Sequence, residues 1–263
     1  MNPYQDFLTR LQATSSDEER AQITLQFNLD NQSKVVREAV QAAAVLHWFD
    51  HNVLNFVLET PLSDAEFNAL VSLPYVEAFP ERGWNVHEKT RDMLCDKLWH
   101  EDVSRYRKLS RRAATWRRKY NPADLVWRAE ATYHSLLAGE RNAEQAFINL
   151  SIDWLNHNQY DVLELLIRPV LNAVHANRLS GRGAAWALFL GARIDYVFGR
   201  KDEAKEALIH ALTIKTDDHA LIVNCTATLA ENRKYFRMTS TGKFSSGTTQ
   251  ATRSDTDGRS SLD

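Results

Sequence analysis

The sequence predicts an all-α protein that carries one small β-hairpin. Helix-forming Ala, Leu, Glu and Arg are common among the 263 residues, and only nine Gly and six Pro interrupt them. Apolar residues make up 44% of the chain, which is ample for a hydrophobic core, and most recur at helical spacing. The exception is the stretch 75–87, where two short alternating segments flank a Pro/Gly turn, a pattern typical of a β-hairpin.

Composition and charge exclude several classes of protein. The net charge of −2 gives no global attraction to nucleic acid. The two cysteines, Cys95 and Cys225, form no disulfide framework or metal-ligand spacing, so we expect them as small apolar residues on helix faces. No apolar run approaches the roughly 18 residues of a transmembrane helix, and the N-terminus lacks the regions of a secretory signal. We therefore expect a cytoplasmic protein with no membrane partner.

Residues 1–32 are expected to form two short helices, near 3–12 and 17–29. Ser16 followed by Glu19 is a capping-box pattern at the start of the second helix. Helices of this length need tertiary contacts to persist. We expect them to pack against the next segment, or to be what remains of a helical element in a longer protein.

Residues 33–120 predict a winged helix-turn-helix domain that ends in a basic helix. Apolar residues at helical spacing predict its first three helices near 35–46, 53–57 and 63–72. Ser63 and Glu66 form a second capping-box pattern at the start of the third. The hairpin at 75–87 follows as the wing, and the next helix carries an apolar face of Met93, Leu94, Leu98 and Trp99.

The helix expected at about 103–120 is strongly basic. It contains eight Lys or Arg residues within fifteen positions, and no acid. Five of these cations are candidate docking residues: Arg105, Lys108, Arg111, Arg112 and Arg118. Such a helix beside a winged helix suits nucleic acid, but it also suits a solvated face or a surface that docks acidic helices. The expected recognition helix argues against DNA, because it carries Asp64 and Glu66 and no Lys or Arg.

Residues 121–236 are expected to form helical hairpins of the tetratricopeptide-repeat (TPR) type. Helices are predicted near 122–138, 142–157, 159–176, 181–198, 201–214 and 218–234. In the clearest unit, the run from Gly199 to Ala204 matches the second half of a TPR. A weaker match begins at Asn158, an offset of 41 residues that exceeds the 34 of an ordinary TPR. We therefore expect an irregular, TPR-like superhelix whose concave face binds protein partners.

The segment 237–263 differs in composition from the rest of the chain. Twelve of the 25 residues in 239–263 are Ser or Thr, and apolar residues are nearly absent. Such a tail cannot offset its ordering entropy by burial, so we expect it to be disordered.

Several runs within residues 34–215 resemble one known family. The runs are Phe49-Asp50, Leu73-Pro74-Tyr75-Val76-Glu77, Trp84-Asn85-Val86-His87-Glu88 with Arg91, and Asp102-x-x-x-Tyr106 followed by Leu109-x-x-Arg112-Ala113-Ala114. Together they resemble the winged-helix segment of the STAND-type signalling ATPases, NLR-like regulators found in multidomain bacterial proteins. His87 stands where that family carries its Met-His-Asp motif, with Val in place of Met and Glu in place of Asp. The resemblance implies that His87 senses nucleotide by contacting its diphosphate, provided that an ATPase domain is supplied.

No catalytic motif accompanies this resemblance. The chain lacks a Gly-rich phosphate loop, an H-E-x-x-H motif, paired cysteines and a G-x-S-x-G motif, so we expect no enzyme activity, cofactor or metal. The alternative for His87 is a purely structural role, in which it caps or orients the helix that follows it. His134 is expected as a satisfied helix-packing histidine, while His47, His51 and His157 show no partner pattern.

The sequence therefore predicts a non-enzymatic protein–protein interaction and regulatory module. It resembles the signal-coupling arm of a STAND ATPase, either as a fragment or as a partner in trans for a nucleotide-binding domain. The alternative is a winged-helix DNA-binding transcriptional regulator with a TPR-like sensor domain. The two readings differ in salt dependence, since a protein that contacts several phosphates loses affinity steeply as salt rises.

Overall fold

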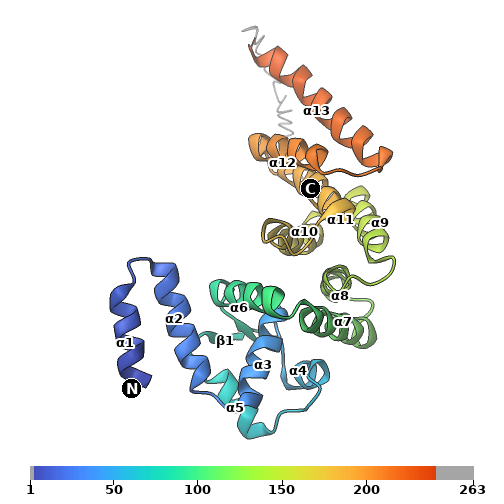
Figure 1. Cartoon of the computed structure of the whole chain (residues 1–263). Coiled ribbons are helices and arrows are strands. Elements are labelled where there is room, and N and C mark those ends of the chain that lie inside the picture. The colour runs from blue at the N-terminus through green and yellow to red at the C-terminus, as the bar shows by residue number, and fades with distance from the viewer. Residues whose placement is uncertain (1–2, 241–263) are drawn as a thin grey trace, which may run out of the picture.

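The structure is a computed structural model that describes residues 3–240, with side chains described for residues 3–230. Within this range the chain forms thirteen α-helices and one two-stranded sheet (Figure 1). The prediction of an all-α fold with one small hairpin is confirmed. None of the described helices combines the length and the hydropathy needed to cross a bilayer.

The two N-terminal helices lie at one edge of the molecule (Figure 1). α1 (Pro3–Ala13) buries none of its residues, and α2 (Asp17–Asp30) buries only Leu29. The Ser16 hydroxyl caps α2 by accepting a hydrogen bond from the Glu19 N–H at 3.4 Å. The return bond that would complete the predicted capping box is not formed at this cap, where the hydroxyl donates to Glu18 at 3.3 Å.

α3 (Lys34–Val45) is the centre of the next segment. Seven of its twelve residues are buried, and α4, α5, α6, α7 and β2 all contact it. The capping box predicted from Ser63 and Glu66 is confirmed, with both of its bonds formed at the start of α5. The elements around α3 are α4 (His51–Val57), α5 (Asp64–Val71), β1 (Val76–Phe79), β2 (Gly83–Val86) and α6 (Glu88–Glu101).

The predicted hairpin is confirmed as an antiparallel pair in which Val76 lies opposite Val86. A third stretch joins it through Phe49, whose N–H donates to the Trp84 carbonyl at 2.8 Å, while the Trp84 N–H donates to the Phe49 carbonyl at 2.8 Å. The bridge attaches the connection between α3 and α4 to the hairpin. It was absent from the sequence prediction because one extended residue before a helix has no alternating pattern.

Seven further helices stack in order through the rest of the molecule (Figure 1). They are α7 (Val103–Tyr120), α8 (Leu125–Leu137), α9 (Ala143–Asn156), α10 (Tyr160–His175), α11 (Gly181–Val197), α12 (Lys201–Thr213) and α13 (His219–Ser240). Each contacts the next one along the chain, and α8, α9 and α11 also contact the helix after that.

The ends of this stack differ from the predicted boundaries. α8 begins at Leu125 rather than near 122, because the Asp124 carboxylate accepts hydrogen bonds from the N–H groups of Val126 and Trp127 and acts as the N-cap. α13 extends to Ser240, beyond the predicted end of the hairpins at 236. The remainder of the predicted disordered tail, 241–263, lies outside the described residues.

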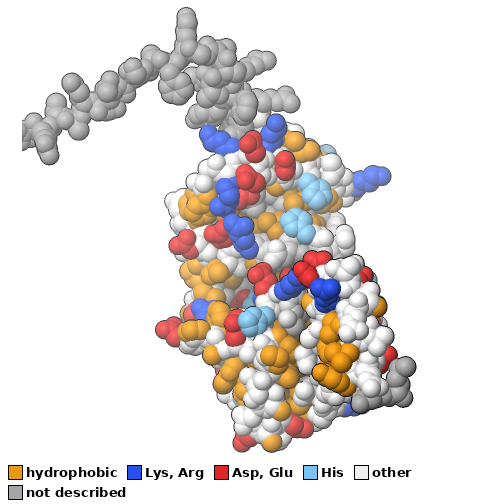
Figure 2. Space-filling view, turned by 90° about the vertical axis from the view of Figure 1, so that its left-hand side faces the viewer, with side chains coloured by type: hydrophobic (Ala, Val, Ile, Leu, Met, Phe, Trp, Pro, Cys, Tyr) orange, Lys and Arg blue, Asp and Glu red, His pale blue; other side chains and the backbone are white. Residues whose placement is uncertain are grey.

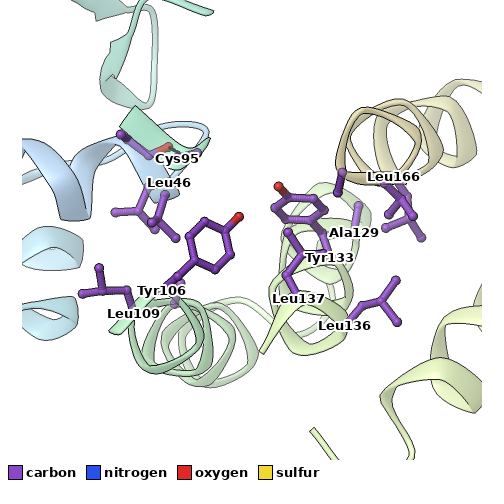
Figure 3. Packing of buried hydrophobic residues seen from close by; sticks show 14 of the residues in the cluster. Leu46, Cys95, Tyr106, Leu109, Ala129, Tyr133, Leu136, Leu137 and Leu166 are labelled. Carbon is purple, nitrogen blue, oxygen red and sulfur yellow. Dashed lines mark hydrogen bonds between the residues drawn. The ribbon is translucent and has the colours of Figure 1, made fainter. Parts of the chain in front are cut away.

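One hydrophobic core runs through both parts of the chain. Figure 3 shows Leu46 and Cys95 on one side, then Tyr106 on α7, Tyr133 on α8 and Leu166 on α10. The hydroxyl groups of the two tyrosines point toward each other across the junction (Figure 3). The boundary predicted at 120/121 therefore falls between two closely packed helices and not in a free linker.

Candidate functional site

The basic helix α7 lies between the α3–α6 segment and the hairpin stack, with contacts to α3, α4, α6 and α8. Its buried stripe is Tyr106, Ser110, Ala113 and Arg117, which follow one another at helical spacing. Trp116 is only partly buried, and its ring stacks on Tyr120 with ring centroids 3.8 Å apart.

All five predicted docking cations have partners within the chain. On the side of α4, Arg105 lies 3.9 Å from Glu38, Lys108 binds Glu59, and Arg112 donates to the backbone carbonyls of Phe56 and Leu58. On the side of α8, Arg111 donates to the Ala138 carbonyl at 3.4 Å, and Arg118 donates to Ser135 and Glu140, each at 2.9 Å. Four of the five residues line one of two hollowed surfaces, and Arg111 lines neither.

The first surface is a groove of about 520 Å³ between α3, the α4–α5 connection and α7. Arg105, Lys108 and Arg112 line it together with Lys34, and the carboxylates of Glu38, Glu59 and Asp102 line it as well. The hydrogen bond from Lys108 and the charge of Lys108 lower the pKa of Glu59. The four cations of this groove therefore face three carboxylates, and the remaining charge, on Arg112, is held by backbone carbonyls.

The second surface is a hollow of about 390 Å³ over α8, the α8–α9 turn and α9. We call it the α8–α9 hollow. Arg118, Arg128 and Arg141 line it, and Glu140 is the one acid among its lining residues. Partial burial by itself would raise the pKa of Glu140, but the hydrogen bonds and charge of Arg118 outweigh this effect and lower it.

His87 follows β2 and occupies the N-cap position of α6. Its side chain makes no capping hydrogen bond, so the capping role considered from the sequence is not filled by the imidazole. The ring is half exposed, and its Nε2 atom lies 3.4 Å from a carboxylate oxygen of Glu77. His87 lines neither the groove nor the α8–α9 hollow.

A buried polar cluster, His47–Glu130–His134, was missed from the sequence. His47 Nδ1 lies 2.7 Å from Glu130 Oε1, and His134 Nε2 lies 3.6 Å from Glu130 Oε2. His134 is fully buried, as expected, but neither of its ring nitrogens has a partner at hydrogen-bond distance, so it is not the satisfied histidine that was predicted. The spacing of Glu130 and His134 on one helix face was a usable signal, whereas nothing local connects them to His47.

Arg117 is the other functional candidate that sequence reasoning did not single out. Its guanidinium carbon lies 3.3 Å from the Trp48 ring centroid and 4.7 Å from the Trp127 ring centroid. Its Nη2 atom donates to the Trp48 carbonyl at 2.8 Å. Burial lowers the pKa of Arg117 to about 10, so the side chain stays charged at neutral pH. Trp48 lies before α4 and Trp127 lies on α8, so Arg117 connects the two parts of the chain.

The described residues offer no arrangement of His, Cys, Asp and Glu side chains suited to a metal ion. The face in Figure 2 carries acidic and basic side chains interspersed over the hairpins, without one continuous basic area. No family model, no curated protein and no solved structure matches this chain.

Proposed function

We propose that the chain is a non-enzymatic protein–protein interaction and regulatory module. In this proposal, α3 to α6 with the hairpin act as a winged helix, and α8 to α13 act as a TPR-like superhelix that holds protein partners. The module resembles the signal-coupling arm of a STAND ATPase, and it works either as part of a larger protein or in trans with a nucleotide-binding domain.

The observation that carries the proposal is the position of Arg117. Its guanidinium is held between an indole of the first part and an indole of the hairpin stack; Arg117 and Trp48 are buried, and Trp127 is partly buried. Cation–π contacts of this kind are strongest when they are desolvated. A displacement of the α3–α6 segment would therefore move α8 with it, which is the property that a coupling arm requires.

The arrangement of the other elements also supports this proposal. The order of helices α3, α4 and α5, hairpin and α6 is compatible with the proposed winged helix-turn-helix. In the stack, contacts to the next helix and to the one after it are those expected of repeats that bury a shared core.

His87 is the residue that we propose to sense nucleotide in such a complex. Its half-exposed imidazole can donate a hydrogen bond to a phosphate oxygen that a partner domain brings to it. Glu77 lies 3.4 Å from the ring, and its contact with His87 would have to break when the phosphate binds.

The test of the coupling proposal uses a nucleotide-binding domain encoded in the DNA that flanks this gene. We expect the full chain to slow the release of labelled ADP from that domain. His87→Ala should abolish the effect, while His157→Ala, at the exposed histidine that follows α9, should leave it unchanged. A His87→Ala variant that slows release as well as the native chain contradicts the assignment. Flanking DNA without a phosphate-loop domain contradicts the STAND resemblance.

Two observations favour this proposal over the DNA-binding alternative. The helix α5 presents no Lys or Arg, and the five cations singled out on α7 have partners within the chain. A fluorescent DNA duplex should therefore keep its mobility at low salt when the protein is added. Retardation that weakens steeply with added salt would support the alternative instead.

A further inference from the structure

The α8–α9 hollow differs from the groove at α7 in that two of its cations have no acidic partner among the described residues. Arg118 is neutralised by Glu140, which it binds through two nitrogen atoms at 2.9 and 3.2 Å. Arg128 and Arg141 are exposed, and no described acid pairs with either of them. The guanidinium of Arg128 lies 5.9 Å from the Trp154 ring centroid, so it is positioned by a ring and not by a carboxylate. The hollow therefore carries two unneutralised positive charges on a chain whose net charge is −2.

The floor of the hollow is apolar and shallow. It is lined by three small residues of α8 and α9, Ala131, Ala143 and Ala146, and by Leu150. Side chains of this size allow the backbone of a partner to come close, and Leu150 offers apolar surface to one of its residues. Thr132 also lines the hollow and adds a hydroxyl group beside the arginines.

We infer that the α8–α9 hollow binds an acidic amphipathic peptide segment of a protein partner. Carboxylates of that segment meet the guanidinium groups of Arg128 and Arg141, and an apolar side chain rests on the alanines and Leu150. Charge complementarity decides in favour of this occupant, because arginine pairs with carboxylates through a planar, two-pronged geometry. Two free cations around an apolar floor are too few to follow a nucleic-acid backbone. This inference rests on the proposed interaction function and specifies the chemistry of the partner.

The experiment measures binding of fluorescent peptides to the full chain by anisotropy. The probe is a peptide with Glu and Leu at helical spacing, and two matched peptides carry Lys in place of Glu or Ala in place of Leu. We expect the Glu/Leu peptide to bind and both matched peptides to bind at least about tenfold more weakly. Affinity should also fall as salt rises.

Two double variants each reverse two positive charges, one in the α8–α9 hollow and the other on α12. Arg128→Glu combined with Arg141→Glu should weaken binding of the Glu/Leu peptide at least about tenfold. The control combines Lys201→Glu with Lys205→Glu on the exposed face of α12 and should stay within about twofold of the native chain. Circular dichroism of both variants establishes that they are folded.

Three outcomes would overturn the inference. The first is equal weakening by the two double variants, which would mean that only net charge matters. The second is a DNA duplex that displaces the peptide as well as the unlabelled peptide does. The third is a dimer, seen by sedimentation, that is lost in the Arg128/Arg141 variant, because the occupant would then be a second copy of this chain. A chain that slows ADP release through His87 but does not distinguish the peptides contradicts this inference alone, whereas failure of both experiments contradicts the proposed function.

Discussion

The Nδ1 atom of His47 lies 2.7 Å from Oε1 of Glu130, although the two residues are 83 positions apart in the chain. Glu130 also faces His134, one helical turn further along α8. Burial alone would raise the pKa of Glu130, but the charges of the two histidines and the hydrogen bond with His47 outweigh burial and hold it well below its usual value. Burial is the largest influence on His134 and lowers its pKa. The His47–Glu130–His134 cluster is therefore a charged contact between the α3–α4 connection and the hairpin stack.

This cluster predicts that the free energy of unfolding falls as the pH is lowered. The pKa values of His134 and Glu130 are both lower in the folded chain than their ordinary values of 6.5 and 4.5. The unfolded chain therefore binds protons first, and stability declines below about pH 6.5 through His134 and further below about pH 4.5 through Glu130. Urea unfolding followed by circular dichroism at a series of pH values measures this dependence.

The control for the pH series separates a buried histidine from an exposed one. His134→Gln should flatten the dependence between pH 6.5 and 5, whatever its effect on absolute stability. His210→Gln, at an exposed position of α12, should leave the dependence as it is in the native chain. Identical slopes for all three proteins would contradict the role assigned to His134.

Replacement of Arg117 should strongly destabilise the chain. Arg117→Ala removes a buried cation from between Trp48 and Trp127, together with its hydrogen bond to the Trp48 carbonyl. We expect a loss of about 3 kcal/mol in the free energy of unfolding, measured in urea. Lys119→Ala, two positions along the same helix and exposed, should change it by less than about 0.5 kcal/mol. A small loss for Arg117→Ala would mean that the two parts of the chain are held together by apolar packing alone.

Gly83 is required by the hairpin for two separate reasons. Its φ of +99° is rarely adopted by residues with a side chain, and an added Cβ would lie 2.4 Å from the Phe49 carbonyl oxygen. Gly83→Ala should therefore cost more than about 2 kcal/mol in urea unfolding. Gly139 also has a positive φ, of +65°, but a Cβ added there would have no atom within 4 Å. Gly139→Ala should therefore cost only about 1 kcal/mol. Equal costs would show that backbone conformation, and not the contact with Phe49, sets the requirement.

Asp218 attaches α13 to the rest of the stack. Its carboxylate accepts hydrogen bonds from Trp186 Nε1 at 2.8 Å, Arg182 Nε at 2.7 Å and the Leu221 N–H at 3.0 Å. Burial would raise the pKa of Asp218, but these donors lower it to about 2. Asp218→Ala should speed amide hydrogen exchange in α13 and cost about 1–2 kcal/mol, whereas Asp202→Ala, exposed in the first turn of α12, should have little effect. Unchanged exchange in α13 would contradict this attachment.

Sequence patterns between neighbouring residues were enough to locate most of the helices and the hairpin. A capping box such as Ser63–Glu66 acts within one helical turn, and the alternation around residues 80–83 acts within a few residues, so both could be read from neighbouring positions. The predicted start of α8 was wrong because helical spacing does not fix the first residue of a helix, which the Asp124 carboxylate sets by accepting hydrogen bonds from free N–H groups.

The candidate site was less accessible from sequence. Helical spacing could not predict that Arg117 lies on the buried face of α7, since an arginine is buried only where rings and a carbonyl from distant segments receive it. The sequence also could not show that Glu140 neutralises Arg118, or that Arg128 and Arg141 line the same hollow, because these residues meet only in the folded chain.

The amino-acid sequence was sufficient for the helical class, the single hairpin and the order of the elements, because hydrophobic periodicity and capping depend on residues within a few positions of one another. The packing of α7 against α8 decided which charges are paired, which are buried and which remain free to meet a partner. Those properties depend on contacts such as His47 with Glu130, and contacts between distant positions form only when the whole chain has folded.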